Sequence, residues 1–291
     1  MYIKLSDLTK VKGIGSKTIE RIRETLQQEA GYVSRYNEYI KLKKNQIYKG
    51  DCLKLTNGIP DKSIDMVFAD LPYEETQNYW DNMIDLDRLW LQYERIIKDN
   101  GAIVLFGGGN RFAKILYNSN PNMYKYSWFW KKDRGSGFLN ASKQPLRNIE
   151  EILVFYKEQP TYNPQFWRGK PLHGMGDKFK KIKNSNNNYG DFDSQNNPSA
   201  KREGDTKKHP LQLLEFKRPH PPIFSTQKPV ELCNYLIKTY TSEGQIVLDN
   251  CIGSGTTIIS CIETNRNYIG IELKEDTFNL ANKRISYLKA P

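Results

Sequence analysis

Short, wholly apolar segments alternate with stretches of helical periodicity along much of the chain, and this alternation constrains the fold more than any other feature. Near the C-terminus, strand-type residues 245–248 and 268–272 alternate with helix-type residues 256–263 and 276–288. Strands that are apolar on both sides are typical of parallel sheets whose two faces are covered by helices. The sequence therefore predicts an α/β fold with a mostly parallel sheet.

The first half of the chain carries the same alternation, and 291 residues are enough for one large core or two smaller ones. A helix is expected over residues 87–98, where Asn100-Gly101 should end it. The strands expected in this half are residues 46–48, 64–69, 102–106, 126–131 and 151–156. They extend the predicted sheet into the first half of the chain.

Two regions break this rhythm. Residues 160–219 are rich in Gly, Pro and Asn and keep no sustained period, which predicts an insertion that is either ordered by a partner or disordered. Residues 1–30 are expected to form two short helices around Gly13-Ile14-Gly15. The predicted segments are an appendage and linker at 1–45, two halves of one α/β domain at 46–160 and 220–291, and the insertion at 161–219.

The net charge of +11 is concentrated in these two regions. Residues 1–50 hold 11 Lys and Arg against 5 Asp and Glu, and residues 168–218 hold 12 against 6. The rest of the chain is close to neutral. A near-neutral body with two basic patches indicates binding to a polyanion, most simply nucleic acid, and a solvated basic surface is the alternative.

Composition excludes several classes of protein. A mean hydropathy of −0.71 and the absence of apolar runs of roughly 18 residues argue against a membrane span. The first ten residues are too polar for a secretory signal. The four cysteines form no CxxC pair and have no metal-ligand spacing with the three histidines. We therefore expect no metal site, no disulfide and a cytoplasmic protein.

The segment Val247–Thr257 has the strongest local pattern. An apolar strand ends at Asp249, and a Gly253-Ser254-Gly255 turn then leads into a helix. Glycines at such a turn let a ligand approach the backbone amides closely. The next strand ends at Glu272, where an acid can accept hydrogen bonds from ribose hydroxyls. No Lys follows the second Gly, which excludes a phosphate-binding P-loop, and a tight turn without a ligand is the alternative.

A second motif, Asp70-Leu71-Pro72-Tyr73, follows a buried strand and should lie at its carboxyl end, where open α/β sheets hold their sites. Pro72 makes Leu71 extended, so the Leu71 carbonyl can lie beside the Asp70 carboxylate. Two adjacent acceptors suit an amine with two N–H donors, and Tyr73 offers a ring on which a planar base can stack. An ordinary turn is the alternative.

Three segments together resemble the β-type, or permuted, DNA amino-methyltransferases that use S-adenosylmethionine. Asp70–Tyr73 is similar to their [DNS]-P-P-[YFW] motif, Asp249–Thr257 to their D-P-F-x-G-S-G-T-T loop, and Thr226–Leu232 to their T-Q-K-P-x-E-L segment. The catalytic motif precedes the cofactor loop, as in this class. Leu71 and the pair Asn250-Cys251 depart from the family's motifs.

The resemblance implies a permuted Rossmann-like methyltransferase fold with a mostly parallel seven-stranded sheet. It implies that Asp70, Leu71, Pro72 and Tyr73 form the catalytic motif and receive a base flipped out of the duplex. The residues that it implies for cofactor binding are Asp51, Cys52, Lys228, Asp249, Cys251, Ile252, Gly253, Ser254, Gly255, Thr256 and Glu272. Among them, Glu272 would bind the ribose, Asp249 and its turn the methionine portion, and Asp51-Cys52 the adenine. Lys228 would lie near the cofactor pocket, with a contact to DNA as the alternative.

The basic regions also resemble DNA-contacting segments. Val11–Thr18 is similar to the hairpin of a helix-hairpin-helix motif. Its turn would present backbone N–H groups to a phosphate, and its lysines would add charge. The residues implied for this contact are Lys12, Gly13, Gly15 and Lys17. A plain turn between two packed helices is the alternative. Residues 161–219 occupy the place of the family's target-recognition region.

The expected function is methyl transfer from S-adenosylmethionine to adenine N6 at a specific DNA site, as in restriction-modification. Asp70 favours adenine, because the family's cytosine-N4 members more often carry Ser there. Cytosine N4 remains open, as do an amine of RNA or of a protein glutamine and a non-catalytic DNA-binding protein. The sequence leaves open the recognised site, a restriction partner and the oligomeric state, with a homodimer among the options.

Overall fold

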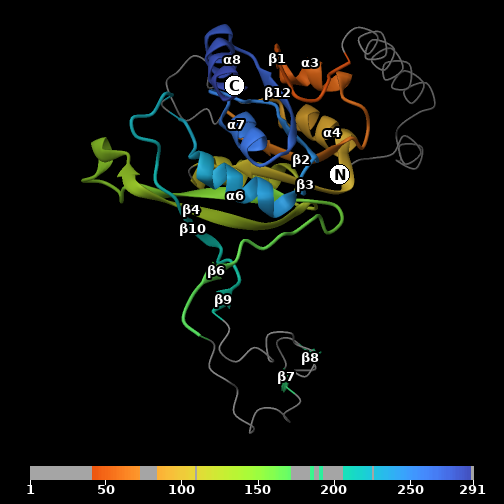
Figure 1. Cartoon of the computed structure of the whole chain (residues 1–291). Coiled ribbons are helices and arrows are strands. Elements are labelled where there is room, and N and C mark those ends of the chain that lie inside the picture. The colour runs from red at the N-terminus through yellow and green to blue at the C-terminus, as the bar shows by residue number, and fades with distance from the viewer. Residues whose placement is uncertain are drawn as a thin grey trace, which may run out of the picture. The chain divides into compact units, whose positions relative to one another are not determined.

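The computed structural model describes residues 41–72, 84–108, 110–171, 184–186, 190–192, 206–224 and 226–289. These residues form two compact units. One contains the described residues up to Tyr162 and from Leu213 onward, and the other contains those from Asn163 to Gln212. The first unit carries the large sheet and its helices (Figure 1).

Eight described strands form the sheet of the first unit, in the order β1-β12-β11-β2-β3-β5-β4-β10. Neighbours are parallel except on both sides of β5, so β5 alone among these eight runs against the others. The strands are β1 Gln46–Lys49, β2 Ile64–Ala69, β3 Ile97–Phe106, β4 Tyr124–Ser136, β5 Arg147–Phe155, β10 Leu213–Glu215, β11 Ile246–Asp249 and β12 Asn267–Glu272. The predicted α/β fold with a mostly parallel sheet is confirmed.

The sheet has eight described strands rather than the seven expected. The additional strand is β10, a three-residue edge strand in which Leu213 pairs with Phe129 of β4. Only Leu214 of this strand is buried, so it lacks the continuous apolar run that marks the other parallel strands.

Helices cover both faces of the sheet, and strand residues alternate between two cores. In β3, Ile103 and Leu105 belong to the core under α3, α4 and α5, whereas Val104 and Phe106 belong to the core under α6, α7 and α8. The helices are α3 Cys52–Leu55, α4 Leu86–Ile96, α5 Asn110–Ser119, α6 Val230–Tyr240, α7 Thr256–Glu263 and α8 Glu275–Lys289, with 3₁₀ turns η1 Thr56–Gly58 and η2 Phe138–Asn140.

The C-terminal strands enter the sheet between strands of the first half, and this arrangement positions the site. β11 and β12 lie between β1 and β2 (Figure 1). Leu248 of β11 pairs in parallel with Val67 of β2, and the Gly50 amide beyond β1 donates to the Glu272 carbonyl of β12 at 2.9 Å. The carboxyl ends of β1, β12, β11 and β2 therefore lie in a row at one edge of the sheet.

Two boundaries differ from the sequence expectation. Helix α4 ends at Ile96 rather than at residue 98, and β3 begins at Ile97, which pairs with Ile64 of β2. Gly101 lies inside β3 instead of ending the helix. A Cβ there would meet the Asp65 carbonyl at 2.9 Å, so glycine permits the close approach of the two strands. Helix α5 is not among the predicted helices, because the three glycines 107–109 before it and the polar residues 118–120 at its C-terminal end are typical of loops.

The second unit contains two short antiparallel pairs. β6 Trp167–Arg168 pairs with β9 Lys207–Lys208, and β7 Asn184–Asn186 pairs with β8 Gly190–Phe192. The Lys207 ammonium lies 3.9 Å from the centre of the Phe166 ring. In neither unit does a helix of the described segments combine the length and the apolar composition needed to cross a bilayer.

Candidate active site

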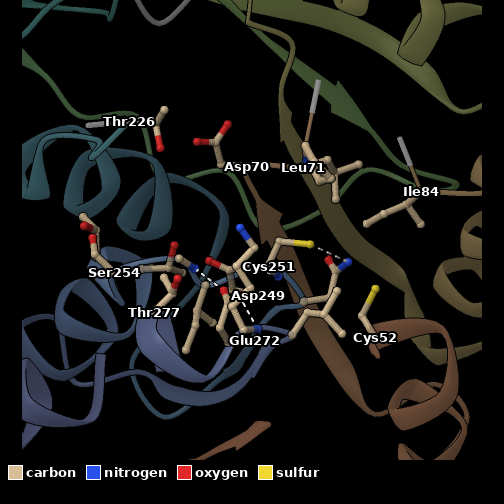
Figure 2. A pocket seen from close by; sticks show the side chains of 18 of the residues that line it. Cys52, Asp70, Leu71, Ile84, Thr226, Asp249, Cys251, Ser254, Glu272 and Thr277 are labelled. Carbon is tan, nitrogen blue, oxygen red and sulfur yellow. Dashed lines mark hydrogen bonds between the residues drawn. The ribbon is translucent and has the colours of Figure 1, made fainter. Parts of the chain in front are cut away.

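A cavity of about 650 Å³ lies at the edge where the four strands end, and segments far apart in the sequence form its walls. Figure 2 shows Asp70 and Thr226 at one end of it and Glu272 toward the other, with Asp249 and Cys251 between them. Its lining residues include Asp51, Cys52, Asp70, Leu71, Pro72, Lys228, Asp249, Cys251, Ile252, Gly253, Ser254, Thr256 and Glu272. The structure thus brings to one cavity most of the residues that the sequence analysis predicted for the site.

The turn after β11 is held by its own backbone and by glycine conformations. The Asp249 carboxylate accepts a hydrogen bond from the Cys251 amide at 2.9 Å. Gly253 and Gly255 have φ of +51° and +83°, a left-handed conformation that costs glycine least. Gly255 does not line the cavity; it precedes α7, and a Cβ there would lie 3.1 Å from that of Ala281.

The turn departs from the family motif at Asn250-Cys251, and a hydrogen bond of Asn250 compensates for this change. The Asn250 side chain is buried, and its Oδ1 accepts a hydrogen bond from the Tyr93 hydroxyl of α4 at 2.6 Å. Arg284 of α8 donates to the Ser254 carbonyl at 2.6 Å. The turn is therefore fastened to helices on both sides of the sheet.

Glu272 is fixed by backbone amides at the end of β12. One carboxylate oxygen accepts from the Gly253 amide at 2.9 Å and the other from the Lys274 amide at 3.0 Å. Burial raises the pKa of Glu272 above its usual value. Each carboxylate oxygen has a further lone pair, so this side chain can also accept hydrogen bonds from ligand hydroxyls.

Asp70 belongs to a cluster of two acids and two lysines, which we call the four-residue charge cluster: Lys132, Asp70, Glu150 and Lys228. The Lys228 ammonium donates to Asp70 Oδ2 and lies 3.1 Å from Glu150 Oε1. The Lys132 ammonium lies 2.8 Å from Glu150 Oε2. Glu150 and Lys228 are nearly inaccessible to solvent, with side chains 5% and 10% exposed. The cluster thus joins Asp70, which follows β2, to β4 and β5.

Burial and neighbouring charges set the ionisation of this cluster. Burial raises the pKa of Asp70 to about 6, with Glu150 adding to the increase and Lys228 opposing it. Burial alone would raise the pKa of Glu150, but the two lysines lower it below its usual value. Burial opposes the charge of Lys228, yet the two acids raise its pKa. At neutral pH the cluster therefore holds two anions and two cations.

The carboxyl group of Asp249, at the centre of the cavity, is the second one whose pKa is raised strongly. Burial raises its pKa to about 7, against hydrogen bonds from Thr257 and the Cys251 amide. A cationic ligand group beside it would favour the ionised carboxylate.

Sequence reasoning missed Glu150 and Lys132. Glu150 and Glu151 stand side by side in the sequence, and nothing in the pattern indicates that Glu150 is the one buried among lysines. Lys228 was predicted beside the cofactor, and the structure places it against Asp70 while it also lines the cavity. The nearby Pro229 is the residue directly before α6.

Some predicted residues lie outside the described part of the chain. These are Tyr73 of the predicted catalytic motif and the four residues of the predicted N-terminal hairpin, Lys12, Gly13, Gly15 and Lys17. Within the described segments, no three His, Cys, Asp or Glu side chains gather in a way that could hold a metal ion.

Comparison with known proteins identifies the class. Residues 64–283 match the DNA methylase family of N6 and N4 enzymes, and the chain belongs to this family. It is 27% identical over 247 residues to the type II methyltransferase M.HpaI of Haemophilus parainfluenzae, covering 81% of this chain and 72% of that relative.

Solved structures show the same fold. The crystal structure of the M1.HpyAVI–SAM complex is similar with a TM-score of 0.53 and 23% identity, covering 82% of this chain and 98% of that one. The cytosine-N4-specific PvuII DNA methyltransferase is similar with a TM-score of 0.57 and 15% identity, covering 84% and 87%. These structures show the fold of the chain, and the family match makes it a DNA methyltransferase.

S-adenosylmethionine is the cofactor of this enzyme, and the cavity fits it. The volume of about 650 Å³ lies within the range of small-molecule sites. A fixed carboxylate at Glu272 suits ribose hydroxyls, and the buried Asp249 carboxyl suits a cationic group. The donor and acceptor groups at both places therefore match the chemistry of the cofactor.

Proposed function

We propose that this chain is a site-specific, type II DNA methyltransferase that methylates N6 of an adenine flipped out of the duplex. One observation carries the proposal: Asp70 and the turn that follows Asp249 line the same cavity, at the ends of adjacent parallel strands. This arrangement would put a base at Asp70 beside a methyl donor held by the turn. The type II relatives support a role in restriction-modification.

We propose that the cofactor lies along the row of strand ends. Glu272 would accept hydrogen bonds from the ribose hydroxyls, and Asp51 with Cys52 would contact the adenine ring. Asp249 and the turn up to Thr256 would hold the methionine portion. The order of β1, β12, β11 and β2 in the sheet supports this placement, because it puts the methionine end nearest to Asp70.

When bound, the cofactor supplies an electrophilic methyl group, so the residues of this chain have to prepare the amine. The amino nitrogen of a base is a poor nucleophile because its lone pair is delocalised into the ring. Asp70 and the Leu71 carbonyl would accept the two amino hydrogens and align the nitrogen for in-line attack. The proton lost on methylation would pass toward Asp70 and then to water.

The Lys228 ammonium gives Asp70 a fixed orientation in this scheme. It donates to one carboxylate oxygen of Asp70, and that side chain keeps lone pairs for an amino hydrogen of the base. Glu150 in turn holds Lys228 from the other side at 3.1 Å. We therefore propose Lys228 and Glu150 as positioning residues for Asp70.

Cytosine N4 is the second candidate for the acceptor. The fold does not separate the two bases, since the cytosine-N4-specific PvuII enzyme has a similar fold. Asp70 supports adenine, because Ser is more frequent at this place in the cytosine-N4 members. We also propose that the N-terminal hairpin around Lys12 and Lys17 binds DNA phosphates and that residues 161–219 contribute to target recognition.

Product analysis tests the proposed function. The enzyme is incubated with tritiated S-adenosylmethionine and genomic DNA from a methylation-free host, and the DNA is hydrolysed to nucleosides. We expect the label in N6-methyladenine. Label in N4-methylcytosine would support the second candidate, and the absence of label from the DNA would contradict a DNA substrate.

The acid limb of the pH profile should report Asp70. With its pKa at about 6, Asp70 is ionised above that pH and becomes protonated below it, where it loses acceptor capacity. We expect kcat/KM for DNA to fall about tenfold per pH unit below about pH 6 and to level off above pH 7. The assay uses saturating cofactor, because a bound cationic group would keep Asp249 ionised and its titration would then not affect this profile. A rate that stays flat down to pH 5 would contradict the role of Asp70.

A further inference from the structure

The hairpin formed by β4 and β5 carries two large apolar side chains at its tip. We call residues 131–149 the tip hairpin. Phe138 and Leu139 are 75% and 84% exposed, the highest values among the exposed large hydrophobic residues of the described chain. Figure 1 shows the hairpin, in yellow-green, extending past the ends of the neighbouring strands. Exposed apolar groups of this size mark a contact surface more often than an isolated surface leucine does.

Strand register places the tip hairpin on the side of the active site. Trp130 of β4 pairs with Glu150, and Glu150 belongs to the four-residue charge cluster. β4 then continues to Ser136, which pairs with Arg147. The register shifts between Lys131 and Ser136, and on β5 the same stretch runs only from Glu150 to Arg147. The paired extension therefore corresponds to about 10 Å of strand. Because β4 runs parallel to β2 and β11, the tip projects from the edge of the sheet that holds the cavity.

The tip has an ordered backbone rather than an open loop. Gly137 adopts φ of +84°, and the 3₁₀ turn Phe138–Asn140 follows it. The Asn140 amide donates to the Gly137 carbonyl at 3.0 Å, and the Lys143 amide donates to the Asn140 carbonyl at 2.9 Å. Phe138 and Leu139 are therefore held outward on a preformed turn, which lowers the entropy lost on insertion into a partner.

The charges of the tip hairpin suit a polyanion. It contains five Lys and Arg and a single acid, Asp133, and two of the five, Lys131 and Lys132, pair with Glu215 and Glu150 outside it. Arg134, Lys143 and Arg147 are exposed, and Asp133 accepts hydrogen bonds from Arg218. Architectural DNA-binding proteins combine the same two features, apolar wedges between base steps and cations on the flanking phosphates.

We propose that the tip hairpin is a DNA wedge, in which Phe138 and Leu139 enter the base stack beside the target base and the exposed cations bind the flanking phosphates. This inference rests on the proposed function, since a base inside a duplex must leave the stack before it can reach Asp70. The wedge occupies the space that the base leaves and so favours the flipped state.

A second copy of this chain is a less suitable occupant of the tip. In a two-fold symmetric dimer the same patch would face itself, and the cations of both tips would repel each other. Two side chains also provide little of the roughly 800 Å² per partner that a stable interface buries. Charge complementarity therefore favours DNA.

The test uses a double variant, Phe138→Ala with Leu139→Ala, and two DNA duplexes. The methylated sequence is first obtained from the genome of a host that expresses the enzyme. One duplex then carries this site fully paired, and the other carries the target base opposite an abasic position. The full-length enzyme is assayed on both with S-adenosylmethionine. Tyr287→Ala is the matched control, because Tyr287 is aromatic, 70% exposed and located on α8.

We expect the double variant to lose about 30-fold in kcat/KM on the paired duplex and to return to within about threefold of wild type on the unpaired one. The control should match wild type on both. Equal losses on the two duplexes, no loss at all, or a change from dimer to monomer in sedimentation would overturn the wedge. If wild-type enzyme transfers no methyl group to any DNA, the proposed function fails instead.

Duplex binding tests the inference without turnover. Replacing Lys143 and Arg147 by Gln should weaken binding to duplex DNA. The slope of log K against log salt concentration should become less steep by about one to two, because fewer counterions are released. Two results together would overturn the proposal even if no transfer can be measured. They are an unchanged salt slope for the Lys143 and Arg147 variant and an unchanged DNA affinity for the Phe138 and Leu139 variant.

Discussion

Replacing Asp70 by Ala is expected to lower the rate of methyl transfer by at least about 10³-fold while cofactor affinity stays within about threefold of wild type. The variant removes the carboxylate that would accept an amino hydrogen of the base. It also leaves the buried Lys228 ammonium beside position 70 with Glu150. A hydrogen-bond donor would then face the hydrogens of the amine, which opposes productive binding of the base. Single-turnover transfer and calorimetric titration of the cofactor measure the two effects.

Two further variants separate chemistry from folding in this experiment. Asp70→Asn keeps the shape and one acceptor oxygen, so it should retain more activity than the alanine variant. Asp99→Ala removes an exposed carboxylate that pairs with Lys62, and it should leave transfer unchanged. Thermal unfolding with and without cofactor checks that Asp70→Ala remains folded and binds. Turnover of Asp70→Ala within tenfold of wild type would rule out the proposed mechanism.

Local sequence was enough to predict the strands that hold the site, because they carry strong and unambiguous patterns. The segments 64–69 and 256–263 have the bounds of β2 and α7. Asp70, Asp249 and Glu272 could be selected because each follows an apolar strand, and the ends of parallel strands share one edge. The resemblance to a methyltransferase family added that Asp70 belongs beside Asp249 and Glu272.

The features that could not be predicted are those that depend on contacts with neighbouring strands of the sheet. Glu150 becomes a buried acid only because β5 lies between β3 and β4, where its side chain meets Lys132 and Lys228. The edge strand β10 forms only because β4 offers it a partner, and α4 ends at Ile96 because β3 pairs with β2 from Ile97 onward. Such contacts join residues far apart in the chain, and no local pattern encodes them.

The exposed tip of the β4–β5 hairpin illustrates a further limit. Phe138 and Leu139 read as apolar residues that a core would bury, yet they lie outside both cores. Their exposure becomes visible only when the register of β4 and β5 is known. An exposed apolar surface of this kind has to be found in the structure.

Glu150→Gln should change both stability and the pH dependence of transfer, although Glu150 does not line the cavity. The substitution keeps the size of the side chain and removes its charge. Lys132 loses its ion pair with Glu150, and Lys228 keeps its ion pair with Asp70. Breaking a buried ion pair by removing one partner costs about 3–5 kcal/mol, so we expect a loss near this size in the free energy of unfolding. Denaturant titration at pH 7 measures it.

The pH profile distinguishes a positioning role of Glu150 from a purely structural one. The negative charge of Glu150 contributes to the raised pKa of Asp70, so its removal should lower the pKa of Asp70 and move the acid limb of kcat/KM to lower pH. At the same time Lys228 should hold Asp70 more tightly and reduce transfer at pH 7.5 by about tenfold or more. Glu151→Gln is the matched control, because Glu151 lies beside Glu150 on β5 and accepts a hydrogen bond from Ser127 at 2.7 Å outside the charge cluster. A loss of stability in Glu150→Gln with the acid limb unmoved would leave Glu150 as a structural residue and contradict its coupling to Asp70.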